Sequence, residues 1–206
     1  MPLFSLSSVD RTSPNELPVI VSRLQSFYQG GAEEIAQNIG IHLAKPLVES
    51  LLAGFRAGFS MEMHAQNTLI SLGEDNLIGR VYFRDLEGVV FSNKFRVERG
   101  LKPLFADIVN DELVWDGSSM RCWFNRNLDH DLGRVFEGAL TVLVARGVLD
   151  TKQKSIAIAS IRKVTRDAIR SADLENIARP GRVLPFSRAP WGNGTRPGHY
   201  FTTRFR

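Results

Sequence analysis

The chain has 206 residues, of which 43% are hydrophobic and 23% are charged, as in ordinary globular proteins with a buried core. No run of about 18 apolar residues is present, and the N-terminal residues lack the basic start and long apolar centre of a secretory signal, so we expect neither a membrane-spanning helix nor export. The single cysteine, Cys122, excludes an internal disulfide and a cysteine-held iron–sulfur cluster, which favours a reducing, cytoplasmic setting.

The net charge of +4 is unevenly distributed along the chain. Residues 151–206 carry 12 Lys and Arg against 3 Asp and Glu, whereas residues 1–150 carry 14 against 19. This basic part favours an anionic partner such as a nucleotide or another small polyanion. A solvated helix face followed by a loose basic tail explains the same charges. Aromatic and basic residues mix near the chain end, but loose tails often show this mixture, so we do not expect nucleic acid to be the partner.

The N-terminal part of the chain has a helical pattern. Ser13 and Pro14 resemble the start of a helix, Gly30-Gly31 interrupts the pattern, and Pro46 marks a boundary or a kink. Apolar residues then recur at helical spacing on one face, at Leu47, Leu51, Leu52 and Phe55. We expect residues 1–58 to form a helical lead-in that packs on a sheet.

Beyond residue 58 the hydrophobic period changes towards two, which is typical of strands. The runs TLISL and RVYFRDL are separated by GEDNLIG, in which Gly73, Asp75 and Asn76 favour a turn. This pattern predicts a β-hairpin over about residues 60–86, within a sheet segment that covers residues 59–105.

The expected turn also predicts which residues face each other across the hairpin. A turn centred between Glu74 and Asp75 places His64 opposite Asp85 and Asn67 opposite Tyr82. The register is defined to within about two residues, and a slip by one residue would move the side chains to the other face.

The helical pattern returns after Ile108. We assign residues 106–178 to a helical segment. The run LDHDLGRVFEGALTVLVARGVL has an Asp-rich start and Gly147 near its end, and an amphipathic segment begins at Thr151. Residues 179–206 contain four prolines and several arginines, which favour an irregular basic tail. The expected fold class is therefore α+β, mainly helical with a small antiparallel sheet.

The stretch MEMHAQNTLI contains an acid, an imidazole and two amides within six residues: Glu62, His64, Gln66 and Asn67. An unpaired polar group costs about 1–3 kcal/mol when it is dehydrated, so solvent or a ligand should satisfy these side chains. The hairpin would bring Arg84 and Asp85 within their reach. A structural histidine and an exposed ion pair are the alternative interpretation of the same residues.

This set has the groups that a nucleoside triphosphate site needs. His64, Gln66 and Arg84 offer donors for phosphate oxygens. Oxygen ligands for Mg²⁺ would come from Asp85 and Asn67, with Glu62 as a further one.

Other motifs indicate chemistry less specifically. GNGTRPG near the chain end lacks the strand and helix that flank a phosphate loop. Asp129 and Asp131, in DHD, could bind a metal, although the pattern favours capping of a helix N-terminus. Cys122 has no histidine partner nearby and is expected to be a buried thiol. Four basic residues of the last helix could present a cationic surface: Lys154, Arg162, Lys163 and Arg166.

The motif EMHAQN, followed by a short hairpin and FRDLEGV, resembles the C-terminal region of the aerobactin-type (IucA/IucC) siderophore synthetases. These enzymes work without a nonribosomal assembly line, and this region of theirs is also described as FhuF-like. The resemblance covers about residues 35–100. The residues that match its pattern are Glu62, His64, Gln66, Asn67, Arg84, Asp85 and Gly88.

The resemblance implies a palm with a β-sheet, in which ATP lies, and a mostly helical thumb, to which residues 106–178 would correspond in position along the chain. It also implies ATP-dependent adenylation of citrate or a related carboxylate, followed by attack of an amine or a hydroxyl. If the roles of the family's motif residues apply to the matching positions here, His64 and Asp85 would be catalytic. His64, Gln66, Asn67 and Arg84 would bind the nucleotide, and Asp85, Asn67 and Glu62 would hold Mg²⁺.

Because the resemblance covers only the C-terminal region of such synthetases, we expect a shortened relative or one portion of a larger enzyme. That portion would pair with an N-terminal half or with a second copy of itself. The FhuF-like label does not imply ferric reductase activity here, because one cysteine cannot hold the required cluster.

Two other functions stay open at this point. A kinase-like phosphotransferase uses the same combination of Asn and Asp, but no glycine-rich nucleotide loop precedes the motif. A non-catalytic module that binds an anion or a partner protein through the basic tail is the second alternative.

Overall fold

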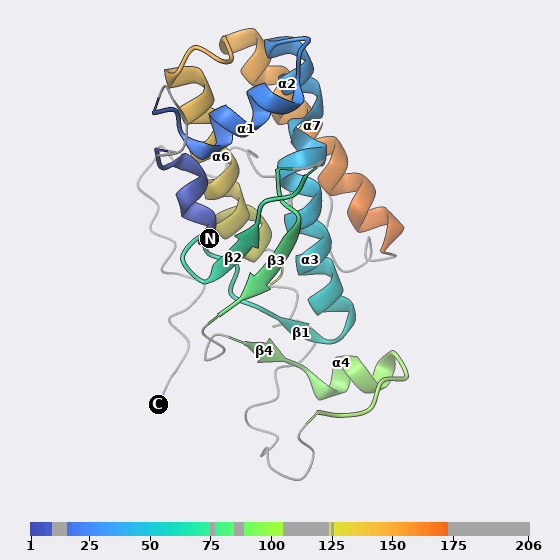
Figure 1. Ribbon diagram of the computed structural model, residues 1–206. Helices are drawn as coiled ribbons and strands as arrows, with labels where there is room; N and C mark the ends of the chain where they lie inside the picture. The colour runs from blue at the N-terminus through green and yellow to red at the C-terminus, as the bar shows by residue number, and fades with distance from the viewer. Residues whose placement is uncertain (10–15, 75–76, 85–88, 105–123, 125, 173–206) are drawn as a thin grey trace, which may run out of the picture.

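A computed structural model describes residues 1–9, 16–74, 77–84, 89–104, 124 and 126–172 (Figure 1). The fold is mainly helical with small antiparallel strand pairs, which confirms the predicted α+β class. Its strands are β1 (Phe59–Ser60), β2 (Thr68–Ser71), β3 (Arg80–Phe83) and β4 (Val90–Phe91). Its helical elements are η1 (Leu3–Ser7), α1 (Val19–Phe27), α2 (Ala32–Ile39), η2 (Gly40–Ala44), α3 (Lys45–Arg56), α4 (Asn93–Glu98), η5 (Asn127–Leu132), α6 (Gly133–Ala145) and α7 (Thr151–Ser171).

Within the predicted lead-in, the described residues form η1, α1, α2, η2 and α3, whereas Ser13 and Pro14 lie outside the described residues. Gly31 has a φ of 80°, a conformation that glycine adopts readily, and it separates α1 from α2. At η2 the helix widens to a π-turn, in which Lys45 donates its N–H to the carbonyl of Gly40. Pro46 has no N–H to donate to the carbonyl four residues earlier, and this missing hydrogen bond explains the wider turn. The wider turn lies where the sequence predicts a boundary or a kink.

The apolar face predicted for α3 is confirmed. Its four residues are 0–4% exposed: Leu47, Leu51, Leu52 and Phe55. Burying one such side chain stabilises the fold by about 1.5–3 kcal/mol. This stripe therefore fixes α3 at the centre of the core.

The hairpin is shorter than predicted, and its pairing differs from the expected one. Residues 61–67 form a loop, so the interpretation of MEMHAQNTLI as a strand is wrong up to β2, which begins at Thr68. Tyr82 faces Leu69 and not Asn67, because the centre of the turn lies one residue further along the chain. Leu77 and Ile78 are buried at this end of the hairpin, and their burial draws additional residues into the turn.

The predicted pairing of His64 with Asp85 concerns a segment that is only partly described. His64 lies in the loop and not in the ladder, and Asp85 lies outside the described residues. The backbone nevertheless continues the pairing beyond β2, since Arg84 donates its N–H to the carbonyl of Asn67 at 3.0 Å. The correction of two residues keeps the predicted faces of the strands, because side chains alternate with a period of two.

The C-terminal helices also follow the prediction where they are described. Asp150 caps α7: its carboxylate accepts the Gln153 N–H at 2.7 Å, and its own N–H donates to the Gln153 side chain at 2.8 Å. Gly147 has a φ of 69° between α6 and α7, as expected for glycine after a helix. Cys122 and the predicted tail, residues 179–206, lie outside the described residues.

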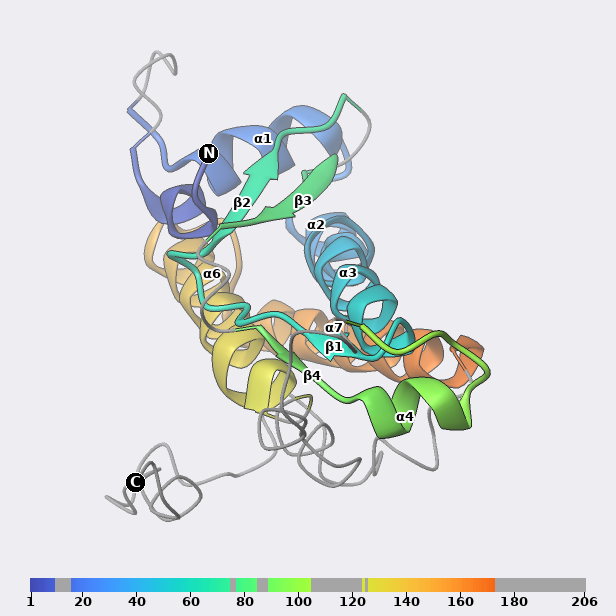
Figure 2. The ribbon, with the colours of Figure 1, turned by 90° about the horizontal axis from the view of Figure 1, so that it is seen from below.

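The helices enclose the hairpin from two sides (Figures 1 and 2). The column formed by α2, η2 and α3 packs against α7, and α6 packs against η1, α1 and α7. The hairpin contacts α3 through β3 and η1 through β2. Of the helices that the structure describes, none combines the length and hydropathy that a membrane-spanning segment needs.

Candidate functional site

The loop of residues 61–67 carries most of the predicted site residues and is held from both sides. Buried Asn127 of η5 accepts the N–H of Met63 at 2.7 Å and donates to the hydroxyl of Ser60 at 3.1 Å. Within the loop, the carbonyl of His64 accepts the N–H groups of Asn67 and Thr68 at 3.0 and 3.1 Å. These bonds fix the turn between β1 and β2 on η5.

Glu62 lies between two basic side chains. Its carboxylate is 3.4 Å from Nη2 of Arg126 and 3.8 Å from Nε2 of His64. The Arg126 contact is a hydrogen bond, whereas the longer His64 contact is an ion pair only when the imidazole is protonated. Glu62 and His64 are thus brought together as predicted, with Arg126 as a partner that the sequence did not indicate.

Gln66, Asn67 and Arg84 occupy three different environments. The Gln66 side chain is exposed, whereas Asn67 is only 6% exposed. Arg84 is exposed and donates through Nε to the carbonyl of Gln66 at 3.1 Å. The guanidinium therefore supports the loop backbone, and Arg84 does not line the cavity described next. Asp85 lies outside the described residues, so its assigned role stays a prediction.

A cavity of about 660 Å³ opens beside this loop, between η1, η5 and α6. Its polar lining residues are Ser7, His64, Gln66, Arg126, His130, Asp131 and Arg134. Its apolar lining residues are Leu3, Phe4, Leu6, Ala65, Val135, Gly138 and Ala139. The volume lies within the range of small-molecule sites, about 300–1,000 Å³. The cavity thus offers hydrogen bonds and positive charge together with apolar surface.

Four polar residues of this cavity were not assigned to the site by the sequence: Arg126, His130, Asp131 and Arg134. A signal was nevertheless present, because Arg126, His130 and Arg134 follow one another at intervals of four residues, which places them on one face of a helix. What the sequence lacked was any indication that this face lies against a loop about sixty residues earlier in the chain.

His130 and Asp131 form a close pair at the cavity wall. Nδ1 of His130 is 2.8 Å from Oδ1 of Asp131. The Asp131 side chain is 4% exposed, and its second oxygen, Oδ2, is buried without a hydrogen-bond partner among the described residues. Both residues belong to η5, a π-helical segment, and such segments are rare and often lie at functional sites.

Asp129 is a second carboxyl group in this segment. Burial raises the pKa of Asp129 from its ordinary value of 3.8 to about 7. One of its oxygens, Oδ1, is buried without a hydrogen-bond partner among the described residues. The interpretation of DHD as an N-terminal cap is wrong, because the residue that precedes η5 is Arg126 and no side chain caps its N-terminus.

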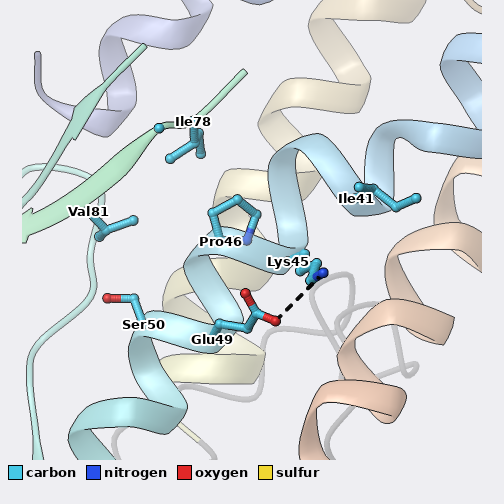
Figure 3. A pocket seen from close by; sticks show the side chains of 8 residues that line it. Ile41, Lys45, Pro46, Glu49, Ser50, Ile78 and Val81 are labelled. Atoms are coloured by element: carbon cyan, nitrogen blue, oxygen red, sulfur yellow. Dashed lines mark ion pairs between the residues drawn. The ribbon is translucent and has the colours of Figure 1, made fainter. Parts of the chain in front are cut away.

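A second, smaller hollow lies between α3 and the start of β3 (Figure 3). Its volume is about 350 Å³, and it is lined by Ile41, Lys45, Pro46, Glu49, Ser50, Ile78, Gly79 and Val81. Lys45 and Glu49 pair with each other on the helix surface at 3.9 Å, and both side chains are about half exposed. An exposed pair of this kind contributes little binding energy. The cavity beside the 61–67 loop is therefore the better candidate site.

The described residues do not by themselves fit a magnesium ion. Among residues 1–9, 16–74, 77–84, 89–104, 124 and 126–172, no three His, Cys, Asp or Glu side chains lie close enough together to hold a metal. Of the predicted ligands, Glu62 is engaged by Arg126 and His64, and Asn67 is buried. The third predicted ligand, Asp85, lies outside the described residues.

No protein-family model matches this sequence, and no curated protein matches it either. The residues of the cavity therefore carry the functional proposal.

Proposed function

We propose that this chain is an ATP-dependent carboxylate-activating ligase of siderophore biosynthesis, or the C-terminal portion of one. It adenylates citrate or a related carboxylate and passes the acyl group to an amine or a hydroxyl, with ATP bound in the cavity beside the 61–67 loop. The observation that carries the proposal is the meeting of His64 and Gln66, from the motif EMHAQN, with Arg126 and Arg134 in one cavity.

The polar lining residues suit a polyphosphate. They include two arginines and a single aspartate, so their charge favours an anionic ligand. Arginine presents several N–H groups in a plane and binds phosphate oxygens in pairs. Gln66 is exposed and can donate its amide hydrogens to the same ligand.

The apolar lining residues suit the nucleoside part of ATP. Phe4 is 53% exposed, which is unusual for a phenylalanine, and it lines the same cavity as Val135 and Ala139. A base that stacks on an aromatic ring gains about 1–3 kcal/mol. The mixed lining therefore suits a ligand that has both charged groups and a flat, apolar part.

The proposed reaction begins when an oxygen of the substrate carboxylate attacks the α-phosphorus of ATP. A bond forms between that oxygen and phosphorus, and the bond to pyrophosphate breaks. Negative charge develops on the leaving pyrophosphate, and Arg126, Arg134 and His64 would stabilise it as fixed positive or hydrogen-bonding groups. Mg²⁺ normally accompanies ATP and would shield its phosphates, with Asp85 as its predicted ligand. An enzyme that uses ATP and citrate would work in the cytoplasm.

The test measures ligand binding and the first half-reaction in the full chain. We expect ATP with Mg²⁺ to raise the melting temperature by several degrees, because a ligand at about 100 times its Kd adds about 2.7 kcal/mol. We also expect citrate-dependent exchange of pyrophosphate into ATP. Gly138 lines the cavity, and a Cβ added there meets no atom within 4 Å, so Gly138→Leu should fill the cavity without disturbing α6 and should abolish both signals.

The matched control is Glu137→Leu, which places the same side chain on the exposed face of α6 and should leave binding unchanged. Release of ADP in place of AMP and pyrophosphate would indicate a phosphotransferase. ATP protection without any turnover would indicate a non-catalytic anion-binding module. Equal protection in wild type and in Gly138→Leu would show that ATP binds elsewhere.

A further inference from the structure

The pairing of His130 with Asp131 has a chemical consequence beyond anion binding. Neutral imidazole has one N–H and one basic nitrogen, and the hydrogen bond made by one nitrogen decides which atom is basic. With Nδ1 of His130 2.8 Å from the Asp131 carboxylate, Nδ1 carries the hydrogen and Nε2 carries the basic lone pair. The arrangement of a buried carboxylate that orients a histidine is also the one that activates nucleophiles in hydrolases.

Asp131 is placed to hold the histidine and not to meet solvent. Its side chain is 4% exposed, whereas that of His130 is 27% exposed, and both residues line the cavity. The carboxylate lies behind the ring, and the imidazole is the more accessible of the two groups. A surface ion pair would expose both partners to a similar degree, as Lys45 and Glu49 do.

We propose that His130 is the general base of the transfer half-reaction, taking the proton of the attacking amine or hydroxyl, and that Asp131 is its positioning residue. This inference rests on the proposed function and adds to it the group that activates the second substrate. The other histidine of the cavity, His64, has Nε2 3.8 Å from the Glu62 carboxylate and is assigned to the phosphates in the proposed function.

In the transfer step, the nucleophile attacks the acyl adenylate. The nucleophile N–H or O–H forms a bond from its nitrogen or oxygen to the carbonyl carbon of the acyl adenylate. Its proton passes to Nε2 of His130, and the bond between that carbon and the AMP oxygen breaks. AMP leaves with the electron pair, and the imidazolium returns its proton to water. The developing positive charge on His130 is stabilised by Asp131, which is the reason for a carboxylate at this position.

Several charged groups surround His130 and affect the pH dependence of the step. Asp129 and Asp131 belong to the same element, Arg126 precedes it and Arg134 follows on α6, and His64 lies on the facing loop with Glu62 behind it. A general base acts only in its neutral form, so we expect transfer to fall in acid.

The experiment separates the two half-reactions in the full chain with ATP, Mg²⁺ and citrate. Adenylation is measured by pyrophosphate exchange, and transfer is measured by AMP release that depends on hydroxylamine, a small nucleophile. For His130→Ala we expect exchange within about threefold of wild type and transfer lower by about 100-fold. Added imidazole should restore part of the transfer, which a merely structural role of His130 would not permit.

Two further variants complete the test. Asp131→Asn should lower transfer about tenfold, keep the pH dependence and show no rescue by imidazole, because the histidine is present but no longer held. Glu137→Gln, on the exposed face of α6, should match wild type in both half-reactions. Melting temperatures of all variants show whether a loss comes from unfolding.

The outcomes distinguish this inference from the proposed function. Equal loss of exchange and transfer in His130→Ala, or no loss of either, would overturn the role of His130 as a base. Exchange in wild type without any transfer to hydroxylamine would overturn it as well. Absence of exchange in wild type would overturn the proposed function, and with it this inference.

Discussion

At the scale of single residues, the buried carboxyl of Asp129 makes stability depend on pH. The pKa of Asp129 is raised to about 7 by burial, so the folded state holds a proton at pH values where the unfolded chain has already lost it. The stability that this proton contributes is fully present below the ordinary pKa of 3.8. It is lost as the pH rises towards about 7.

We therefore expect Asp129→Asn to raise the free energy of unfolding at pH 8 and to change it little at pH 4. The gain should be about 1 kcal/mol, well below the full conversion of the shift, because a partly exposed carboxyl is still solvated by water. Urea unfolding of both proteins at the two pH values measures the difference. A gain that is the same at both pH values would contradict the assignment.

At the scale of elements, the loop of residues 61–67 depends on η5 for its position. Asn127 is fully buried and is bonded to the backbone N–H of Met63 and to the hydroxyl of Ser60. Removing this side chain leaves a buried N–H unpaired, which costs about 1–3 kcal/mol. The same change releases the turn that carries His64 and Gln66.

Asn127→Ala should therefore lower the melting temperature and also weaken ATP binding at temperatures where the variant is still folded. Ser60→Ala is the matched comparison, because it removes only the weaker of the two contacts and leaves the bond to Met63 in place. Calorimetric titration with ATP and Mg²⁺ gives both affinities. If both variants bind ATP as wild type does, the loop does not need its anchor on η5.

At the scale of the whole molecule, the packing of η2 against α7 joins the N-terminal and C-terminal helices. Gly40 permits the close approach: a Cβ built there would lie 2.6 Å from the backbone oxygen of Ser160. Gly40 also donates its N–H to the Ser160 hydroxyl at 3.2 Å, and that hydroxyl donates to the carbonyl of Gln37 at 2.6 Å. A backbone atom cannot move aside as a flexible side chain can.

We expect Gly40→Ala to destabilise the chain by about 1–3 kcal/mol, because the two helices must separate. Gly138→Ala is the control: it adds the same methyl group in a helix with open space around it, and there alanine should stabilise by about 0.5–1 kcal/mol. Thermal unfolding of the two variants gives the comparison. Equal effects would mean that helix propensity, and not packing, dominates at both positions.

Much of the fold follows from local pattern. The helical period of Leu47, Leu51 and Phe55 predicts the buried face of α3, since residues at that spacing share one side of any helix. Gly31 and Gly147 lie between helices with positive φ, a conformation that glycine adopts readily. These predictions depend only on residues within about one helical turn along the sequence.

The pattern was misleading where burial of distant residues competes with it. MEMHAQN reads as a strand, but it forms a loop whose Met63 N–H is bonded to Asn127 of η5. The centre of the hairpin turn lies one residue further along the chain than predicted, and Leu77 and Ile78 at the end of the turn are buried. In both segments, contacts with distant residues compete with the local pattern.

The sequence alone therefore determined the α+β class, the buried face of α3 and the closeness of Glu62 and His64. Only the tertiary structure decided that His64 and Gln66 share a cavity with Arg126, His130, Asp131 and Arg134. The physical reason is range: periodicity depends on neighbours along the chain, whereas a binding site depends on which surfaces the core brings together. The residues that meet in this cavity are more than sixty positions apart in the sequence. Local propensity depends only on near neighbours and cannot predict such contacts.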